Sequence, residues 1–222
     1  MDRPVLVRKI TGIIGEINRL TNTLYSLSMT DAQRYPENYE VLSIDAAHRA
    51  EMIACRLRNL VYTTTSAEKD DYLRSAADAM DIEVSSRDGV IEITLPCLLP
   101  KKKKGESCDF LVGPLTAAMS VFAEEHRMPR MEHCVICFSH IYNREQPERR
   151  VRDYDNIELK KLLDITASYI LSDDNGLLCD AYNTTELGDA DRTVISIMES
   201  ERFPRWLEER QLVLKFIKDF HG

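Results

Sequence analysis

The sequence predicts an α+β fold, in which an N-terminal helical module precedes a small mixed α/β domain and a C-terminal helix. Apolar residues recur every three or four positions through about the first 80 residues, and near residue 82 this recurrence changes to alternation. The chain of 222 residues is 44% hydrophobic and 30% charged, which suits one large globular domain or two small ones. The predicted segments are 1–81 for the helical module, 82–200 for the mixed domain and 201–222 for the C-terminal amphipathic helix.

The helical module begins with a heptad repeat. Seven apolar residues from Leu6 to Leu27 are spaced alternately four and three positions apart, which predicts one apolar seam along a helix. A second stripe, from Tyr39 to Leu60, predicts a helix that packs on the first, and a third, short helix is expected over 68–80. We expect the module to act as an arm, as a dimerisation element or as a bundle packed on the rest.

Alternating apolar residues from Ile82 onwards predict a β-hairpin, with Asp88 and Gly89 forming its turn. Pro96 and Pro100 end the second strand and keep the following segment extended. The remaining predicted elements are a helix over 110–126, a strand over 134–142, a helix over 157–170, strands over 177–182 and 193–198, and a helix over 205–220.

Composition favours a cytoplasmic protein without a membrane partner. No stretch approaches 18 consecutive apolar residues, and the first residues lack the pattern of a signal peptide. The six cysteines are widely spread, so reduced thiols are expected. The net charge of −8 conceals a basic centre, because residues 97–161 carry +2 whereas 1–96 carry −4 and 162–222 carry −6.

Basic residues gather around the first of two aspartate pairs, as expected if they bring phosphate to metal ligands. For the lysine run alone, a solvated loop is an equally good interpretation. The residues that we expect to contact nucleic acid are Lys101, Lys102, Lys103, Lys104, Arg149, Arg150, Arg152 and Lys161.

The two aspartate pairs are Asp153 with Asp155 and Asp173 with Asp174, separated by one predicted helix. If that helix returns the chain, the four carboxylates converge and can bind Mg²⁺ or Mn²⁺, which prefer oxygen ligands and leave positions open for water and phosphate. Taken singly, each pair has a structural explanation. Asp155 resembles a helix N-cap, and the second pair resembles a tight turn.

A metal centre at these aspartates predicts phosphodiester hydrolysis, because a bound divalent ion activates water and neutralises the scissile phosphate. Lys160, near the start of the following helix, is the candidate to stabilise the pentavalent phosphorane or to protonate the leaving group. An ordinary solvent-facing helix lysine is an equally good interpretation of its spacing. Asn156 is a candidate to orient Asp155 or a water molecule.

The cysteine and histidine residues over 133–140 do not predict a zinc site. On a strand, Cys134 and His140 face one side whereas His133 and Cys137 face the other, so the four side chains cannot surround one ion. We interpret this stretch as a core strand.

Residues 88–200 resemble the RusA-type Holliday-junction resolvases. The resemblance lies in the strand and proline-containing basic loop from Ile91, the Arg-Asp-Tyr-Asp-Asn motif at 152–156, the helix that follows, and the Asp-Asp motif at 173–174. It implies a small mixed α/β domain, a homodimer, dependence on Mg²⁺ or Mn²⁺, and cleavage of branched DNA. It also implies that Asp153, Asp155 and one or both of the second pair are metal ligands, and that Lys160 is the catalytic lysine.

The chain departs from this family in the position of that lysine, because Leu159 stands where the family has it and Lys160 and Lys161 follow. The whole chain also resembles an uncharacterised bacterial family associated with mobile elements. Three hypotheses result: a metal-dependent endonuclease on branched or structured DNA, used in recombination or mobile-element maintenance; a non-catalytic accessory protein on a resolvase-like fold; and an interaction protein with no nucleic acid partner.

Overall fold

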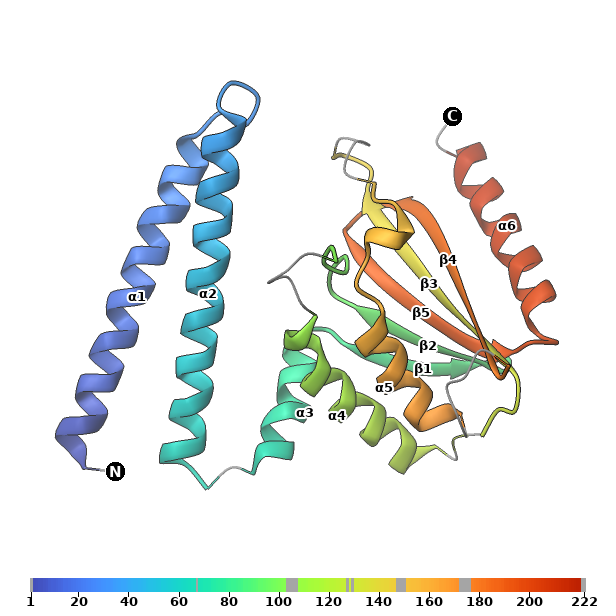
Figure 1. The fold of residues 1–222 in the computed structure, drawn as a ribbon, viewed down its shortest axis with the longest axis horizontal. Coiled ribbons are helices and arrows are strands. Elements are labelled where there is room, and N and C mark those ends of the chain that lie inside the picture. Colours follow the sequence, from blue (N-terminus) through green and yellow to red (C-terminus); the bar gives the residue numbers. More distant parts are fainter. Residues whose placement is uncertain are drawn as a thin grey trace. The chain divides into compact units, whose positions relative to one another are not determined.

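The protein has an α+β fold that divides into two compact units, Met1–Lys69 and Asp70–Gly222, in a computed structural model (Figure 1). The structure describes residues 2–66, 68–102, 108–126, 128, 130–146, 151–171 and 177–220, with side chains described through residue 211. Among these described residues, no helix is long and apolar enough to cross a membrane.

Unit 1 contains the two long helices, and unit 2 contains the sheet with shorter helices. The elements of unit 1 are α1 (Arg3–Met29) and α2 (Pro36–Thr64). The elements that follow are α3 (Lys69–Ala79), β1 (Glu83–Arg87), β2 (Val90–Leu95), α4 (Asp109–Glu125), β3 (Cys134–Asn143), the 3-10 turn η2 (Tyr154–Asn156), α5 (Lys160–Ile170), β4 (Cys179–Gly188), β5 (Arg192–Glu199) and α6 (Phe203–Phe220).

The first two helices form a hairpin, as their apolar stripes predict (Figure 1). The heptad seam of α1, however, is only partly buried. Ile13 is buried, whereas Ile10, Ile17 and Leu24 stay 39%, 42% and 48% exposed. A single neighbouring helix covers one edge of an apolar stripe, so the other edge of the seam is left at the surface.

Unit 2 is built around a five-stranded sheet in the order β1-β2-β5-β3-β4. The strands are antiparallel except for β3 and β4, which are parallel and are connected through α5. The predicted hairpin turn is confirmed: Asp88 and Gly89 both have positive φ angles, of 52° and 77°, as a two-residue hairpin turn requires. Because β3 and β4 are parallel, their carboxyl ends lie at the same end of the sheet.

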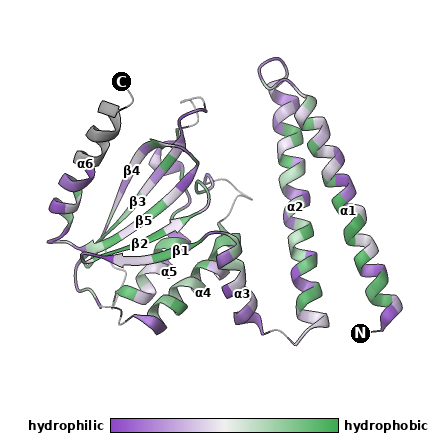
Figure 2. Ribbon diagram, turned by 180° about the vertical axis from the view of Figure 1, so that it is seen from behind, coloured by the Kyte–Doolittle hydropathy of each residue, from purple (hydrophilic) through white to green (hydrophobic). Residues whose placement is uncertain are grey.

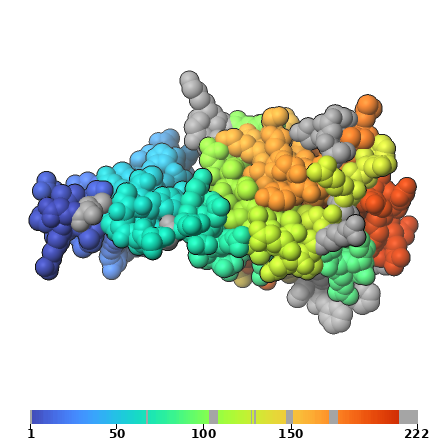
Figure 3. Space-filling view, turned by 90° about the horizontal axis from the view of Figure 1, so that it is seen from below, coloured from blue at the N-terminus to red at the C-terminus, as the bar shows by residue number. Residues whose placement is uncertain are grey.

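The main core lies between the sheet and helices α4 and α5, which lie side by side over one face (Figure 3). Alternation along β3 directs Ile136 and Phe138 into this core, where both are fully buried. The other face of the sheet packs on α6, where Trp206 covers Cys137. Both faces of the central strands are therefore covered, which explains their nearly continuous apolar sequence.

Helix α3 belongs with the sheet and not with the helical module in which the sequence placed it. The compact units divide at Lys69, and Ala77 on α3 is 2% exposed within the main core. Arg74 on the same helix pairs with Glu124 on α4 at 3.1 Å. The C-terminal helix also belongs to unit 2, through Trp206.

Helix α5 begins at Lys160, three residues later than the predicted helix over 157–170. Ile157 is 1% exposed and forms an antiparallel β-bridge with Lys101, so its backbone is extended. The backbone N–H of Glu158 donates to the Pro100 carbonyl at 2.9 Å. These long-range contacts override the local helical pattern, and the residue that precedes α5 is Leu159, not Asp155.

Candidate functional site

The first aspartate pair lies in the segment after β3 that contains η2. Asp153 immediately precedes the 3-10 turn, and Asp155 lies within it. Both side chains are exposed, and neither has a hydrogen-bond or ion-pair partner among the described residues. The interpretation of Asp155 as the N-cap of the next helix is therefore wrong, because Leu159 holds that position without a side-chain bond. The carboxylates have no structural role that the described residues reveal.

The backbone on either side of these aspartates is held against the carboxyl ends of β3 and β4. The N–H of Arg152 donates to the Tyr142 hydroxyl at 3.1 Å, and its guanidinium donates to the Leu99 carbonyl. The hydroxyl of Tyr154 lies 3.0 Å from the Thr185 hydroxyl on β4. The loop is thus attached to two strands, which fixes the backbone that carries the aspartates.

Two lysines of the basic run lie beside this loop, although about fifty residues separate them in sequence. Lys101 forms the β-bridge with Ile157, and the backbone N–H of Lys102 donates to the Asn156 carbonyl at 2.8 Å. Both lysine side chains are exposed. We call Lys101, Lys102, Arg152, Asp153 and Asp155 together the loop surface. It combines cations with carboxylates, as a site for phosphate and a divalent ion requires.

Four of the predicted basic residues lie outside the described residues: Lys103, Lys104, Arg149 and Arg150. Lys160 is the first residue of α5, and its side chain is 79% exposed and 3.9 Å from Asp164. The ammonium of Lys161 donates to Asp109 at the start of α4, and this bond raises the pKa of Lys161. The ion pair of Lys161 thus connects two helices, whereas Lys160 lies near an acidic residue of its own helix.

The second aspartate pair, Asp173 and Asp174, lies outside the described residues, but the residues flanking it are well placed. Leu171 bridges to Met131, and the carbonyl of Leu178 accepts the N–H of Cys134 at 2.9 Å. These contacts are at the amino end of β3, whereas the loop surface lies at its carboxyl end. The six residue-to-residue steps of β4 from Cys179 to Thr185 span about 20 Å between the two levels.

The structure therefore places the first pair and the flanks of the second pair at opposite ends of β4. No group of three or more histidine, cysteine or acidic residues able to hold a metal ion occurs within the described part of the chain. Two carboxylates still suit Mg²⁺, which is commonly held by one or two carboxylates together with water and substrate phosphate. Of the four predicted ligands, the structure describes Asp153 and Asp155.

A histidine that the sequence assigned to the core lies beneath the loop surface. His140 is 1% exposed, and its Nε2 is 3.2 Å from the Asn183 side-chain oxygen on β4. Its ring centroid lies 5.9 Å from that of Tyr154. Burial lowers the pKa of His140, the Asn183 bond opposes this effect, and the charge of Arg152 adds to it. Spacing alone could not place His140 here, because the β3–β4 pairing is a long-range contact.

The cysteines of β3 confirm the alternation that argued against a zinc site. Cys134 belongs to the core beneath α4 and α5, whereas Cys137 packs with Trp206 on the opposite face of the sheet. Burial raises the pKa of the Cys137 thiol, so it is protonated near neutral pH. Cys134 and Cys137 thus have structural positions on opposite faces.

The chain belongs to the DUF6100 family, described as a family of unknown function, which it matches over residues 2–220. No curated protein matches the chain.

Proposed function

We propose that the chain acts on branched or structured DNA at the loop surface and hydrolyses a phosphodiester there with the aid of Mg²⁺ or Mn²⁺. The observation that carries this proposal is the backbone pairing of Lys101 and Lys102 with the segment that follows Asp155. It joins cations and carboxylates that the sequence keeps far apart. The resemblance of the Asp-x-Asp-Asn motif to resolvases supports the same reaction.

Each residue of the loop surface has a chemical role in this proposal. Asp153 and Asp155 would hold the divalent ion, which supplies a water molecule of lowered pKa and charge for the phosphate when it is bound. Lys101, Lys102 and Arg152 would bind phosphates of the DNA backbone. Because the Arg152 guanidinium also donates to a backbone carbonyl, its position is fixed before DNA arrives.

Lys160 remains the candidate for charge stabilisation or leaving-group protonation. Its side chain is 79% exposed at the first residue of α5, which directly follows the loop. The distance of 3.9 Å to Asp164 is long for an ion pair, so little energy opposes a movement toward substrate. We propose this role for Lys160 in preference to Lys161, whose ammonium is bound to Asp109.

A second candidate function is a non-catalytic accessory protein that binds DNA or another protein through the same surface. One observation favours it: the flanks of the second aspartate pair lie at the opposite end of β4 from Asp153 and Asp155. Without a further carboxylate, the loop surface retains the cations that bind DNA but has fewer metal ligands. Binding would then occur without cleavage.

The experiment that tests the proposal is incubation of the full chain with labelled four-way junctions and Mn²⁺. We expect specific cleavage by the native chain and at least about a hundredfold loss in Asp155→Asn, because a metal ligand is removed. Asp189→Asn is the matched control: it alters the chain's other Asp-x-Asp sequence, at a side chain that is 82% exposed. Equal activity of native chain and Asp155→Asn would contradict the proposal, and binding without cleavage would favour the accessory function.

A further inference from the structure

The helical hairpin of unit 1 buries very little of its own apolar surface. Along α1 the buried residues are Ile13 and Glu16, and along α2 they are Ala46 and Ile53. Helices gain most of their stability from packing an apolar face on a neighbour. Because these two long helices bury four residues between them, most of their apolar surface is not packed on a neighbour.

Four of the exposed apolar residues of α1 form a stripe along the helix. Their spacing of four, three and seven residues places them on one side of the helix, next to the edge that contacts α2. Apolar residues recur along both helices in Figure 2. The residues of the stripe, with their exposed fractions, are Ile10 (39%), Ile14 (51%), Ile17 (42%) and Leu24 (48%).

A second stripe runs along α2 and consists mainly of small residues. Its two large members, Tyr39 and Leu57, are 38% and 43% exposed. The positions between them at helical spacing are Ser43, Ala50 and Ala54, of which both alanines are exposed. None of the side chains in either stripe is charged. We call the two stripes together the apolar face of the hairpin.

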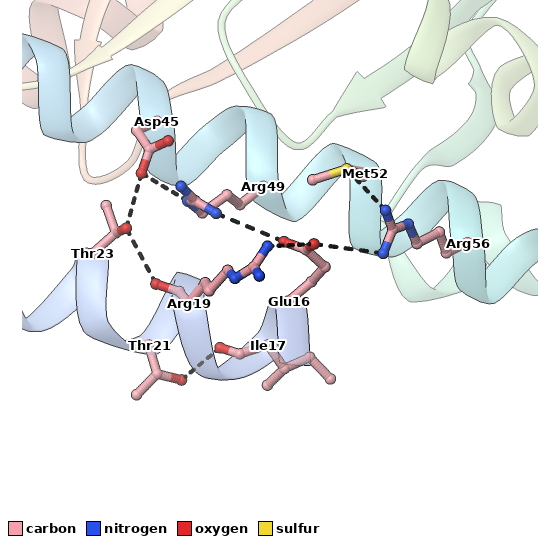
Figure 4. Close-up of polar contacts among 9 residues, drawn as sticks. All are labelled: Glu16, Ile17, Arg19, Thr21, Thr23, Asp45, Arg49, Met52 and Arg56. Atoms are coloured by element: carbon pink, nitrogen blue, oxygen red, sulfur yellow. Dashed lines mark hydrogen bonds and ion pairs between the residues drawn. The ribbon is translucent and has the colours of Figure 1, made fainter. Parts of the chain in front are cut away.

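Both stripes lie on the same side of the hairpin. Counted at about 100° per residue from the inward-facing positions, Ile10 on α1 and Tyr39 on α2 turn to one side of the antiparallel pair. On the same count Glu16, Arg49 and Arg56 turn toward the other side. Glu16 pairs there with Arg49 at 3.7 Å and with Arg56 at 3.6 Å (Figure 4). The ion pairs of Glu16 and the two stripes therefore lie on opposite sides of the hairpin.

We propose that the apolar face is the interface with a second copy of this chain, so that two hairpins form a four-helix bundle. The large residues of α1 and the small residues of α2 complement each other when a two-fold axis places α1 of one copy on α2 of the other. An uncharged face is compatible with itself, because no like charges meet across the axis.

The size of the face supports this partner. From Ile10 to Leu24, with side chains included, it is about 25 Å long, and two helices are about 20 Å wide. About 500 Å² per copy would then be covered, or about 1,000 Å² in total, which reaches the lower limit of specific interfaces. This inference does not depend on the DNA-cleaving function proposed above.

The oligomeric state of the full chain, measured by light scattering and sedimentation, tests the proposal. We expect a dimer for the native chain at about 100 µM, above the micromolar dissociation constants of modest interfaces. Ile17→Glu should weaken association at least about a hundredfold, because two unpaired charges would enter the interface. Ile44→Glu is the matched control, because Ile44 is 47% exposed on the outer side of α2 and should leave the dimer intact.

Far-UV circular dichroism of both variants checks that the helices persist. We expect them to persist because both isoleucines lie at the surface. Ile17→Leu is a conservative variant that should retain the dimer. A native chain that stays monomeric at this concentration overturns the proposal. So does a dimer that survives Ile17→Glu, since it must use another surface, and so does equal dissociation of both glutamate variants.

Discussion

Beneath the loop surface, a buried histidine is held in its neutral form. His140 has almost no exposed area, and its polar neighbours include Asn183, Tyr154 and Arg152. Protonation of His140 would place a second positive charge near Arg152, at a position that solvent does not reach, so the neutral form is favoured. His140 lies on the same strand as Tyr142, to which the loop is bonded.

This environment makes the stability of unit 2 depend on pH. Because the pKa of His140 is lowered from 6.5 in the folded state, the unfolded chain binds more protons below about pH 6.5. We expect the free energy of unfolding to fall as the pH drops below that value, by at most about 1.4 kcal/mol per pH unit from this group.

His140→Gln, which keeps a hydrogen-bonding group beside Asn183, should remove this contribution, whereas His133→Gln, at an exposed position, should not. The measurement is urea unfolding at a series of pH values. An identical pH dependence for native chain and His140→Gln would contradict the explanation.

Among the elements, the hairpin of unit 1 is fixed in register by charged and polar contacts. Glu16 is 8% exposed and lies near Arg19 on its own helix, at 3.0 Å, and near Arg49 and Arg56 on α2. The Thr23 hydroxyl donates to Asp45 at 2.9 Å (Figure 4). These contacts form only when α1 and α2 are aligned in this register.

Glu16→Gln should lower the free energy of unfolding of the hairpin by about 1–2 kcal/mol, since the arginines that surround it lose their shared partner but remain partly solvated. Urea unfolding of the full chain, followed by the helical signal, measures this change. Glu51→Gln, at an exposed position of α2, is the control. The same midpoint for both variants would show that the ion cluster adds no stability.

Local sequence patterns were sufficient to predict the order of helices and strands. Heptad spacing predicts α1 and α2, alternation predicts β2, and Asp88-Gly89 predicts the turn before it, since each signal lies within a few residues. They could not predict that β5 lies between β2 and β3 or that β3 pairs with β4, because pairing is decided by distant segments.

The candidate site, like the fold, could be predicted only in part from local sequence patterns. The Asp-x-Asp-Asn motif and the lysine run are visible in the sequence, but their proximity results from the bridge between Lys101 and Ile157. Burial of Ile157 is also the reason that α5 starts late and that Asp155 does not cap it. The half-exposed heptad seam likewise depends on how many helices surround α1, which spacing does not specify.

Over the whole molecule, the net charge of −8 opposes nucleic acid binding in general, so any binding must come from a local basic surface. The loop surface lies in the one third of the chain that carries a positive net charge. A dimer formed through the hairpins would carry two such surfaces, and binding at one would raise the effective concentration of the other. Branched DNA offers several phosphate backbones for two surfaces.

The most direct test of this account is the salt dependence of junction binding without a divalent ion. We expect the native chain to bind a labelled four-way junction, with an affinity that falls steeply as salt rises. Lys101→Ala combined with Lys102→Ala should reduce the slope of log affinity against log salt by about 2, because two phosphate contacts are lost. Lys9→Ala combined with Lys69→Ala, two exposed lysines of unit 1 that are not part of the loop surface, should keep the native slope. Absence of salt-dependent binding by the native chain, or an unchanged slope in the Lys101 and Lys102 variant, would contradict the account.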